Sequence, residues 1–412
     1  MTARYVDPPD IDPPESQGPA DPGDSEDDGG IMSPAFFLMG ATAGMFWLGI
    51  TSTIPVLPRF IRDELGGGDV MVGAIIGSLA IGAIVARPRL GRLGDTHGRR
   101  LLMAGGGLVA GLATIAHVAV EAQAPMFVLR ILLGIGQAAF MVGVTTMALD
   151  LAPPERRGEA TAYTLVAMHF GIGSGPLLGE WVFNTWSFDA VWLVSAAVFG
   201  LSGAIATLLP VMPASADLPP SERKRFLHPA GLMPGVVLGV GVMGYVGYSA
   251  FVPLFGEEIG IDNVAPLFLV SSITIVLIRF FGARLPDQLG PVRGGSIALV
   301  LMSIGLLVIG IWETVPGLYF GAVVMAIGSA LLFPSLVSAA VDGVPVTERA
   351  SAMATFTLFI DLSSALGVVV FGAISAGTSY SAAFIIGGVL TALALVILLS
   401  PAFPRATTPA AP

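Results

Sequence analysis

The stretch "GRLGDTHGRR" (residues 91–100) lies between two long apolar segments and contains three glycines, three arginines and one aspartate. The whole chain is 54% hydrophobic and only 12% charged, whereas a soluble protein has about a quarter of its residues charged. We therefore interpret the stretch as a short polar connection between two helices of a membrane protein.

The number of apolar stretches predicts the fold class. A hydrocarbon core about 30 Å thick requires about 20 apolar residues per helix, and a β-barrel would instead show alternating segments of about 10 residues. Twelve long apolar stretches are present, at residues 33–58, 70–90, 101–120, 125–149, 160–182, 188–211, 231–255, 264–284, 294–312, 316–340, 350–375 and 380–400. We expect an all-α membrane protein with twelve transmembrane helices.

The longest connection, residues 212–230, divides these helices into two sets of six, at 33–211 and 231–400. An offset of 192 residues aligns the two sets, and it places "RLGDTHG" on "RLPDQLG", Arg87 on Arg279 and Asp150 on Asp342. This internal repeat predicts two pseudo-symmetric six-helix bundles joined by a cytoplasmic linker.

The two tails differ in composition from the membrane region. Residues 1–32 carry nine acids and one arginine among many prolines and glycines, so we expect a disordered cytoplasmic tail. Residues 401–412 form a short C-terminal tail. The acidic start has no basic segment before its first apolar stretch, so we expect that stretch to stay as a helix and not to be cleaved as a signal peptide.

Arginine and lysine in short loops predict the orientation. They gather in alternate connections, while the remaining loops carry only Arg59 and Arg62. The basic set is Arg87, Arg89, Arg92, Arg99, Arg100, Arg156, Arg157, Arg223, Lys224, Arg225, Arg284, Arg293 and Arg349. We expect a multi-pass protein of the cytoplasmic membrane with both termini in the cytoplasm.

Composition also excludes several kinds of chemistry. The chain has no cysteine, and its single lysine, Lys224, stands in "SERKRF", so a Walker A phosphate-binding loop cannot be written. The four histidines are scattered along the chain and form no recognisable metal or hydrolytic set. We expect no cofactor, no metal, no nucleic acid and no enzymatic activity.

Three motifs resemble signatures of the major facilitator superfamily. Residues 91–100 match G-x-L-x-D-x-x-G-R-[RK], through Gly91, Leu93, Asp95, Gly98, Arg99 and Arg100. The stretch "RILLGIG" matches R-x-x-x-G-x-G through Arg130, Gly134 and Gly136. The stretch "GIGSGPLLGE" matches the antiporter motif G-x-x-x-G-P-x-x-G-G through Gly171, Gly175, Pro176 and Gly179, with Glu180 in place of the last glycine.

The resemblance covers residues 33–400 and implies the twelve-helix fold of proton-linked efflux proteins. It implies that the first motif forms a conformational latch, a charge network that includes an acid at the cytoplasmic end of the fourth helix. The matching residues are Gly91, Asp95, Gly98, Arg99, Asp150 and Arg157. A purely topological role, in which these charges only mark the cytoplasmic boundary, is the alternative.

Ionisable residues inside the membrane are functional candidates because they are costly to bury. Asp361 stands about 18 Å along its helix from Arg349, close to the midplane, and the offset pairs it with His169. Arg130 lies inside the fourth helix, where the resemblance links it to proton transfer. We expect Asp361 to exchange a proton, with Arg130 and His169 assisting; packing for His169 and snorkelling for Arg130 are the alternatives.

The glycines and Pro176 of the fifth helix predict close packing, which we expect at the interface between the halves. The functional hypothesis is a monomeric secondary transporter in a lipid bilayer, exporting a small drug-like molecule or metabolite in exchange for protons. A uniporter or importer on the same fold, and a non-transporting receptor or intramembrane enzyme, are the alternatives.

Overall fold

The computed structural model describes residues 33–153, 156–211, 227–261, 263–282, 285–345 and 348–403, without the side chains of residues 92, 95, 158, 286, 287, 349 and 350. The acidic tail, nearly all of the linker and most of the C-terminal tail lie outside these ranges. All the regular elements within them are helices. Ten of these are long and apolar enough to cross a membrane.

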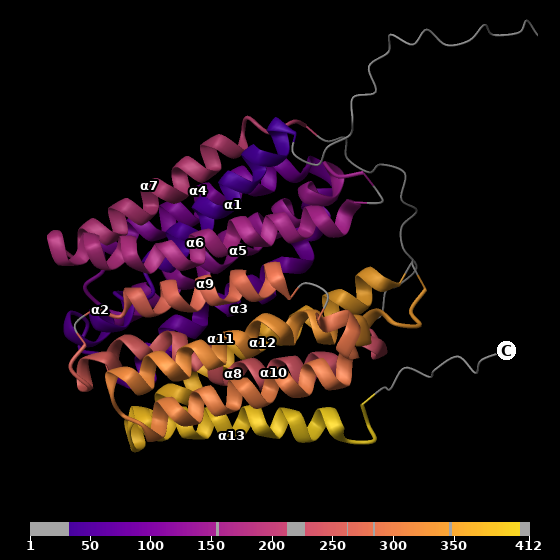
Figure 1. Cartoon of the computed structure of the whole chain (residues 1–412). Helices are drawn as coiled ribbons and strands as arrows, with labels where there is room; N and C mark the ends of the chain where they lie inside the picture. The colour runs from indigo at the N-terminus through magenta and orange to yellow at the C-terminus, as the bar shows by residue number, and fades with distance from the viewer. Residues whose placement is uncertain are drawn as a thin grey trace, which may run out of the picture.

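The N-terminal half forms one bundle (Figure 1). One continuous helix over residues 33–58 was expected at its start. The structure has two helices there, because α1 ends at Ser52 and α2 begins at Leu57. The elements are α1 Pro34–Ser52, α2 Leu57–Asp63, α3 Asp69–His97, α4 Arg99–Ile115, the 3-10 turn η1 Ala116–Ala119, α5 Gln123–Asp150, α6 Arg157–Thr185 and α7 Phe188–Ala206.

The C-terminal half forms the second bundle, drawn below the first in Figure 1. Serine and threonine side chains cap several helices of both halves, as Thr314 and Ser379 do here by accepting from the first-turn N–H groups. The elements are α8 Pro229–Glu258, α9 Ala265–Phe281, α10 Leu285–Ile311, α11 Val315–Val341, α12 Arg349–Gly377 and α13 Tyr380–Leu399.

The two halves contact each other chiefly through two helix pairs, α3 with α12 and α6 with α9. The offset of 192 residues relates these pairs. It also relates Gly98 and Gly290, which both have positive φ (88° and 70°) and interrupt the helices at equivalent turns. Only glycine adopts this conformation readily. The pseudo-symmetry predicted from sequence is therefore present in the backbone.

We name the two ends of the bundle by their loops. The basic end holds the start of α1, the turn at Gly98 and the connection from α5 to α6; the opposite end holds α2 and the loops that follow α6 and α8. At the opposite end one hydrophobic core combines residues of both halves, including Phe60 and Val72 with Phe251 and Phe255. This shared core holds the halves together at that end.

The other large core belongs to the N-terminal half alone. Its centre is an aromatic group in which Phe46 stacks on Phe140 with ring centroids 4.0 Å apart, and Phe199 meets Phe46 edge to face at 5.0 Å. Because aromatic contacts of this kind add to the burial of apolar area, this group stabilises the interior of the N-terminal half.

Candidate functional site

The α3–α12 interface carries an ion pair between the two halves. Arg87 Nη1 lies 2.6 Å from Asp361 Oδ2, and Arg87 Nη2 donates to Asp361 Oδ1 at 3.2 Å. Asp361 follows the same helical face as Ala365 and Val368, whose backbones touch Gly77 and Gly73 of α3. The carboxylate predicted near the midplane is thus paired with an arginine of the other half.

The α6–α9 interface is the pseudo-symmetric equivalent. Gly173 packs against Ser272, as Gly77 packs against Ala365 in the first interface. The equivalents of Arg87 and Asp361 here are Arg279 and His169, which are electrostatic neighbours. The His169 ring bonds its own helix, with Nδ1 2.7 Å from the Leu165 carbonyl oxygen. An arginine and a histidine replace the arginine–carboxylate pair.

Arg130 is buried within the N-terminal half and is not brought to Asp361. Its neighbour is His117 of η1, and the His117 ring packs 5.3 Å from Trp192. Arg130 is 6% exposed, and its Nε finds no hydrogen-bond partner among the described residues. The structure gives Asp361 the partner Arg87 and places Arg130 beside His117; the assisting roles of Arg130 and His169 stay a prediction.

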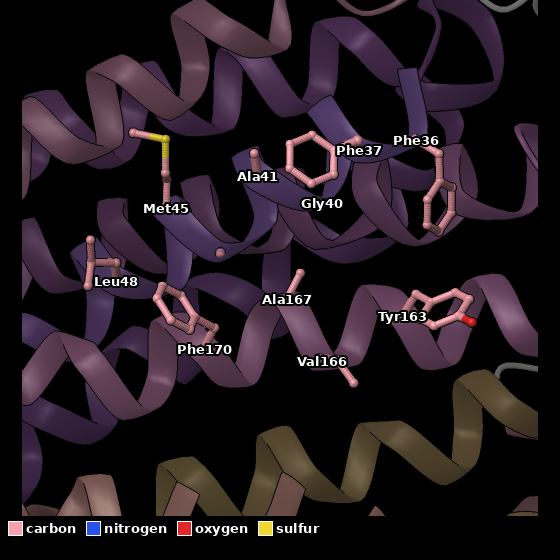
Figure 2. A pocket seen from close by; sticks show the side chains of 11 residues that line it. Phe36, Phe37, Gly40, Ala41, Met45, Leu48, Tyr163, Val166, Ala167 and Phe170 are labelled. Carbon is pink, nitrogen blue, oxygen red and sulfur yellow. The ribbon is translucent and has the colours of Figure 1, made fainter. Parts of the chain in front are cut away.

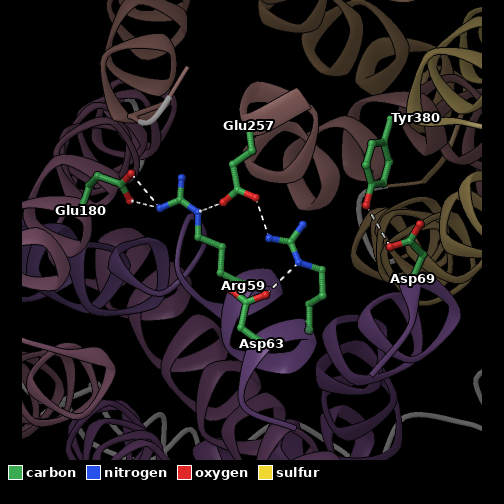
Figure 3. Close-up of polar contacts among 7 residues, drawn as sticks. Arg59, Asp63, Asp69, Glu180, Glu257 and Tyr380 are labelled. Carbon is green, nitrogen blue, oxygen red and sulfur yellow. Dashed lines mark hydrogen bonds and ion pairs between the residues drawn. The ribbon is translucent and has the colours of Figure 1, made fainter. Parts of the chain in front are cut away.

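A charged group, which we call the opposite-end cluster, consists of Arg59, Arg62, Asp63, Glu180 and Glu257 (Figure 3). Arg59 Nη1 donates to both carboxylate oxygens of Glu180, at 2.9 and 3.1 Å. Glu180 is fully buried and Arg59 is 5% exposed. Burying two charges is tolerated only with such close geometry, so the pair fixes α2 against α6.

Glu257 connects this cluster to the other half. It lies on α8, and its two oxygens lie 2.7 Å from Arg59 Nε and 2.6 Å from Arg62 Nη2. A second bond between the halves is nearby, where the Tyr380 hydroxyl of α13 donates to Asp69 Oδ1 of α3 at 3.0 Å (Figure 3). The opposite end is closed by polar bonds as well as by the shared core.

The closest backbone contacts of the first interface lie on the opposite-end side of the Arg87–Asp361 pair. A Cβ added at Gly73 would lie 3.1 Å from the Val368 carbonyl carbon, and one at Gly77 would lie 2.7 Å from the Ala365 oxygen. Further along α3, Gly82 meets Ile131 of its own half, and Gly91 has open space beside it. The described residues are therefore closed at the opposite end by close helix packing as well as by polar bonds.

The residues expected to form the latch lie within the N-terminal half. Arg99 Nε pairs with Asp150 Oδ2 at 3.0 Å, and Arg99 Nη1 donates to the Gly94 carbonyl oxygen. The exposed Arg157 donates from Nε to the carbonyl oxygen of Leu149. The side chain of Asp95 lies outside the described residues. The motif thus joins α3, α4, α5 and the start of α6.

Three glycines of α6, Gly171, Gly175 and Gly179, pack against α1 of the same half and not, as expected, at the interface between halves, whereas Gly173 does lie at that interface. A Cβ at Gly171 would collide with the Gly44 carbonyl oxygen, and one at Gly179 with that of Ser52. Gly175 meets Thr51 on the same line, because residues four apart share a helix face. Pro176 lies inside the same helix.

An apolar groove of about 470 Å³ lies between α1 and α6 (Figure 2). Phe37, Ala41 and Met45 line it, on the face of α1 opposite to Phe46 and its core. Phe37 and Phe170, at its margin, are about three-quarters exposed. Val166 and Phe170, on its α6 side, also line a pocket between α6 and α9 that includes His169, so the groove borders the second interface.

Sequence reasoning missed the partners in these ion pairs. Arg59 and Arg62 were noted only as the two arginines outside the basic loops, and Glu257 was not noted at all. Arg87 was assigned to the basic loops at the cytoplasmic boundary. The signals were Glu180, which departs from the glycine of the motif, and the alignment of Arg87 with Arg279 in the repeat.

Comparison with known proteins places the chain in a family. The sequence model of the Major Facilitator Superfamily matches residues 35–293 and 264–412. An uncharacterised MFS-type transporter of Salmonella typhimurium, STM4428, is 27% identical over 89% of this chain and 96% of its own length. YhhS of Escherichia coli, also an uncharacterised MFS-type transporter, is 25% identical over 85% and 88%.

A solved structure has the same fold. The crystal structure of a bacterial homologue of the human lysosomal transporter Spinster superposes with a TM-score of 0.73 at 13% identity, covering 88% of this chain and 95% of that one. The two bundles, the pseudo-symmetric interfaces between them and the match to the family model all indicate the same fold. The chain belongs to the major facilitator superfamily and is a multi-pass membrane transporter of small molecules, not an enzyme.

Proposed function

We propose that this transporter exports a small organic molecule across the cytoplasmic membrane in exchange for protons, acting as a monomer, and that Asp361 binds and releases the proton. The observation that carries the proposal is the ion pair between Asp361 and Arg87. It lies within membrane-spanning helices and joins the two halves, so its charge state acts directly on their relative position.

Protonation of Asp361 removes its charge and leaves Arg87 with a weaker, neutral hydrogen-bond partner. The bond between α3 and α12 then weakens, and the equilibrium between the two arrangements of the halves shifts. In the state described here the pair is formed and the opposite end is closed. This is the state after a proton has been released toward the basic end.

The direction follows from the orientation. Arginine-rich loops favour the cytoplasmic side, so the basic end faces the cytoplasm and the opposite-end cluster closes the transporter toward the outside. Export requires this cluster to open. The Arg99–Asp150 pair of the latch holds the loops of the N-terminal half as a unit while the halves rotate, so Arg99→Ala impairs transport of every substrate while membrane insertion stays normal.

Uptake into inside-out vesicles tests the function. Vesicles containing the wild type, and vesicles containing Asp361→Asn, are energised to give an acidic lumen and offered a panel of radiolabelled organic anions, cations and neutral compounds. Export by proton exchange predicts uphill uptake of at least one compound by the wild type, abolished by an uncoupler and by Asp361→Asn. Uptake only in right-side-out vesicles would support an importer instead.

A further inference from the structure

Arg279 is a cation within the packed helices that has no anionic partner among the described residues. Two of its guanidinium nitrogens, Nε and Nη1, are enclosed and have no hydrogen-bond partner, and no acidic side chain that the structure describes forms an ion pair with it. Such a group is costly in a membrane protein. Arg279 therefore has unused capacity for charged hydrogen bonds.

The internal repeat shows that the missing partner is specific to this site. The equivalent arginine, Arg87, is neutralised by Asp361 across the α3–α12 interface. At the α6–α9 interface the residue equivalent to Asp361 is His169, and a neutral or protonated imidazole supplies no negative charge. One interface carries a complete ion pair, and the other carries a cation alone.

Arg279 lies near the basic end of α9, in the last turn of the helix. It lies seven residues after Ser272, on the face of α9 that packs on α6, and its electrostatic neighbours are His169 and Tyr245 of α8. The adjacent Phe280 and Phe281 are at least three-quarters exposed. Arg279 thus lies between α6 and α8, close to the basic end.

We propose that Arg279 binds an anionic group of the substrate, so that the transported molecule is an organic acid whose carboxylate supplies the missing negative charge. This inference deepens the proposed export function. It rests on that function only in taking the bound anion to be the transported substrate. The planar guanidinium offers two parallel donors to a carboxylate. Tyr245, whose ring centroid lies 6.4 Å from that of Tyr248, adds aromatic surface for the apolar part of the molecule.

The neutral amide of the same acid has nearly the same shape but no charge. Binding it leaves the guanidinium buried without a counter-ion, and sites with unpaired buried polar groups discriminate strongly against such analogues. We expect a carboxylate to bind at least about 10-fold more tightly than its amide. Arg279→Gln removes this preference, and Arg279→Lys keeps a weaker one because lysine retains the charge without the two-donor plane.

Binding is measured by thermal-shift titration and calorimetry of the full-length protein in detergent. The probes are benzoate, cinnamate, hexanoate and 1-naphthoate, each with its amide. Arg293→Gln is the matched control, since Arg293 is an exposed arginine of the same half. The proposal predicts a carboxylate preference in the wild type and in Arg293→Gln that is lost in Arg279→Gln.

Equal binding of acids and amides by the wild type, no saturable binding of any of the four acids, or a preference that persists in Arg279→Gln, would overturn the proposal. The melting temperature without ligand shows whether each variant is folded. If Arg279→Gln is not folded, the reduced carboxylate preference expected for Arg279→Lys is the test. These measurements need no gradient. Anion preference without proton exchange would therefore leave this inference intact and reject proton-coupled export.

Discussion

Arg87 and Asp361 lie on different halves of the transporter and are joined at 2.6 Å, whereas their pseudo-symmetric equivalents, Arg279 and His169, form no ion pair. The two interfaces between the halves therefore differ in charge although they share one backbone arrangement. We propose that this asymmetry assigns proton binding and substrate binding to different interfaces. The α3–α12 interface responds to protons, and the α6–α9 interface recognises the substrate.

The Arg87–Asp361 pair predicts coupling between two substitutions. Arg87→Gln leaves a carboxylate in the membrane interior without its cation, and we expect a loss of about 1–3 kcal/mol in stability, less than for a fully buried pair because both side chains are partly exposed. The double variant Arg87→Gln/Asp361→Asn should recover part of this loss. Thermal denaturation in detergent measures all four proteins, and strictly additive losses would show that the two side chains do not interact.

Glu257 is expected to control closure of the opposite end. Glu257→Gln weakens its bonds to Arg59 and Arg62, which join the halves, so the population open at that end should rise. Electron–electron distance measurements between spin labels at positions 121 and 313, both exposed at the opposite end, report the change as a longer-distance population. The adjacent exposed acid gives the control, Glu258→Gln, which should match the wild type. An unchanged distance distribution in Glu257→Gln would remove Glu257 from the gate.

Glu180 is expected to be structural, in contrast to the glycine of the family motif. Glu180→Gly restores the motif but removes the fully buried partner of Arg59 and leaves Glu257, and removing one member of a buried pair costs about 3–5 kcal/mol. We expect low membrane levels and a lower melting temperature for Glu180→Gly and for Arg59→Ala. Wild-type stability in Glu180→Gly would mean that the buried pair contributes little.

The orientation is tested with single cysteines, because the chain has none of its own. Cysteine at position 121, at the opposite end, should react with a membrane-impermeant maleimide in intact cells. Cysteine at position 342, exposed at the basic end, should react only after the membrane is opened. The reverse pattern would invert the topology.

The fold could be predicted because its signals are periodic and local. Twelve apolar stretches and an offset of 192 residues were enough for two bundles, and the offset even aligned Gly98 with Gly290. The break between α1 and α2 was missed although "TSTIPVLPRF" contains two prolines, Pro55 and Pro58. Proline interrupts a helix interior, and the interruption falls at residues 53–56, around Pro55.

The candidate site was only partly predictable. Asp361 and His169 could be found from the cost of burying ionisable groups and from the repeat, but Arg87 could not be chosen as the partner of Asp361 because the pairing depends on which helices meet at the interface. Three glycines of α6 were assigned to the wrong interface for the same reason. Helix spacing groups Gly171, Gly175 and Gly179 on one face, but it does not say that α1 is the helix they meet.

Proton release on substrate binding tests the central claim most directly. Wild type, Asp361→Asn and the exposed control Asp189→Asn are purified in detergent at low buffer concentration with a pH-sensitive dye. The panel compound that drives transport is then added. We predict that the wild type and Asp189→Asn release protons when the compound binds and that Asp361→Asn binds it without releasing any. Equal proton release by Asp361→Asn and the wild type would contradict the assignment of Asp361 as the proton carrier.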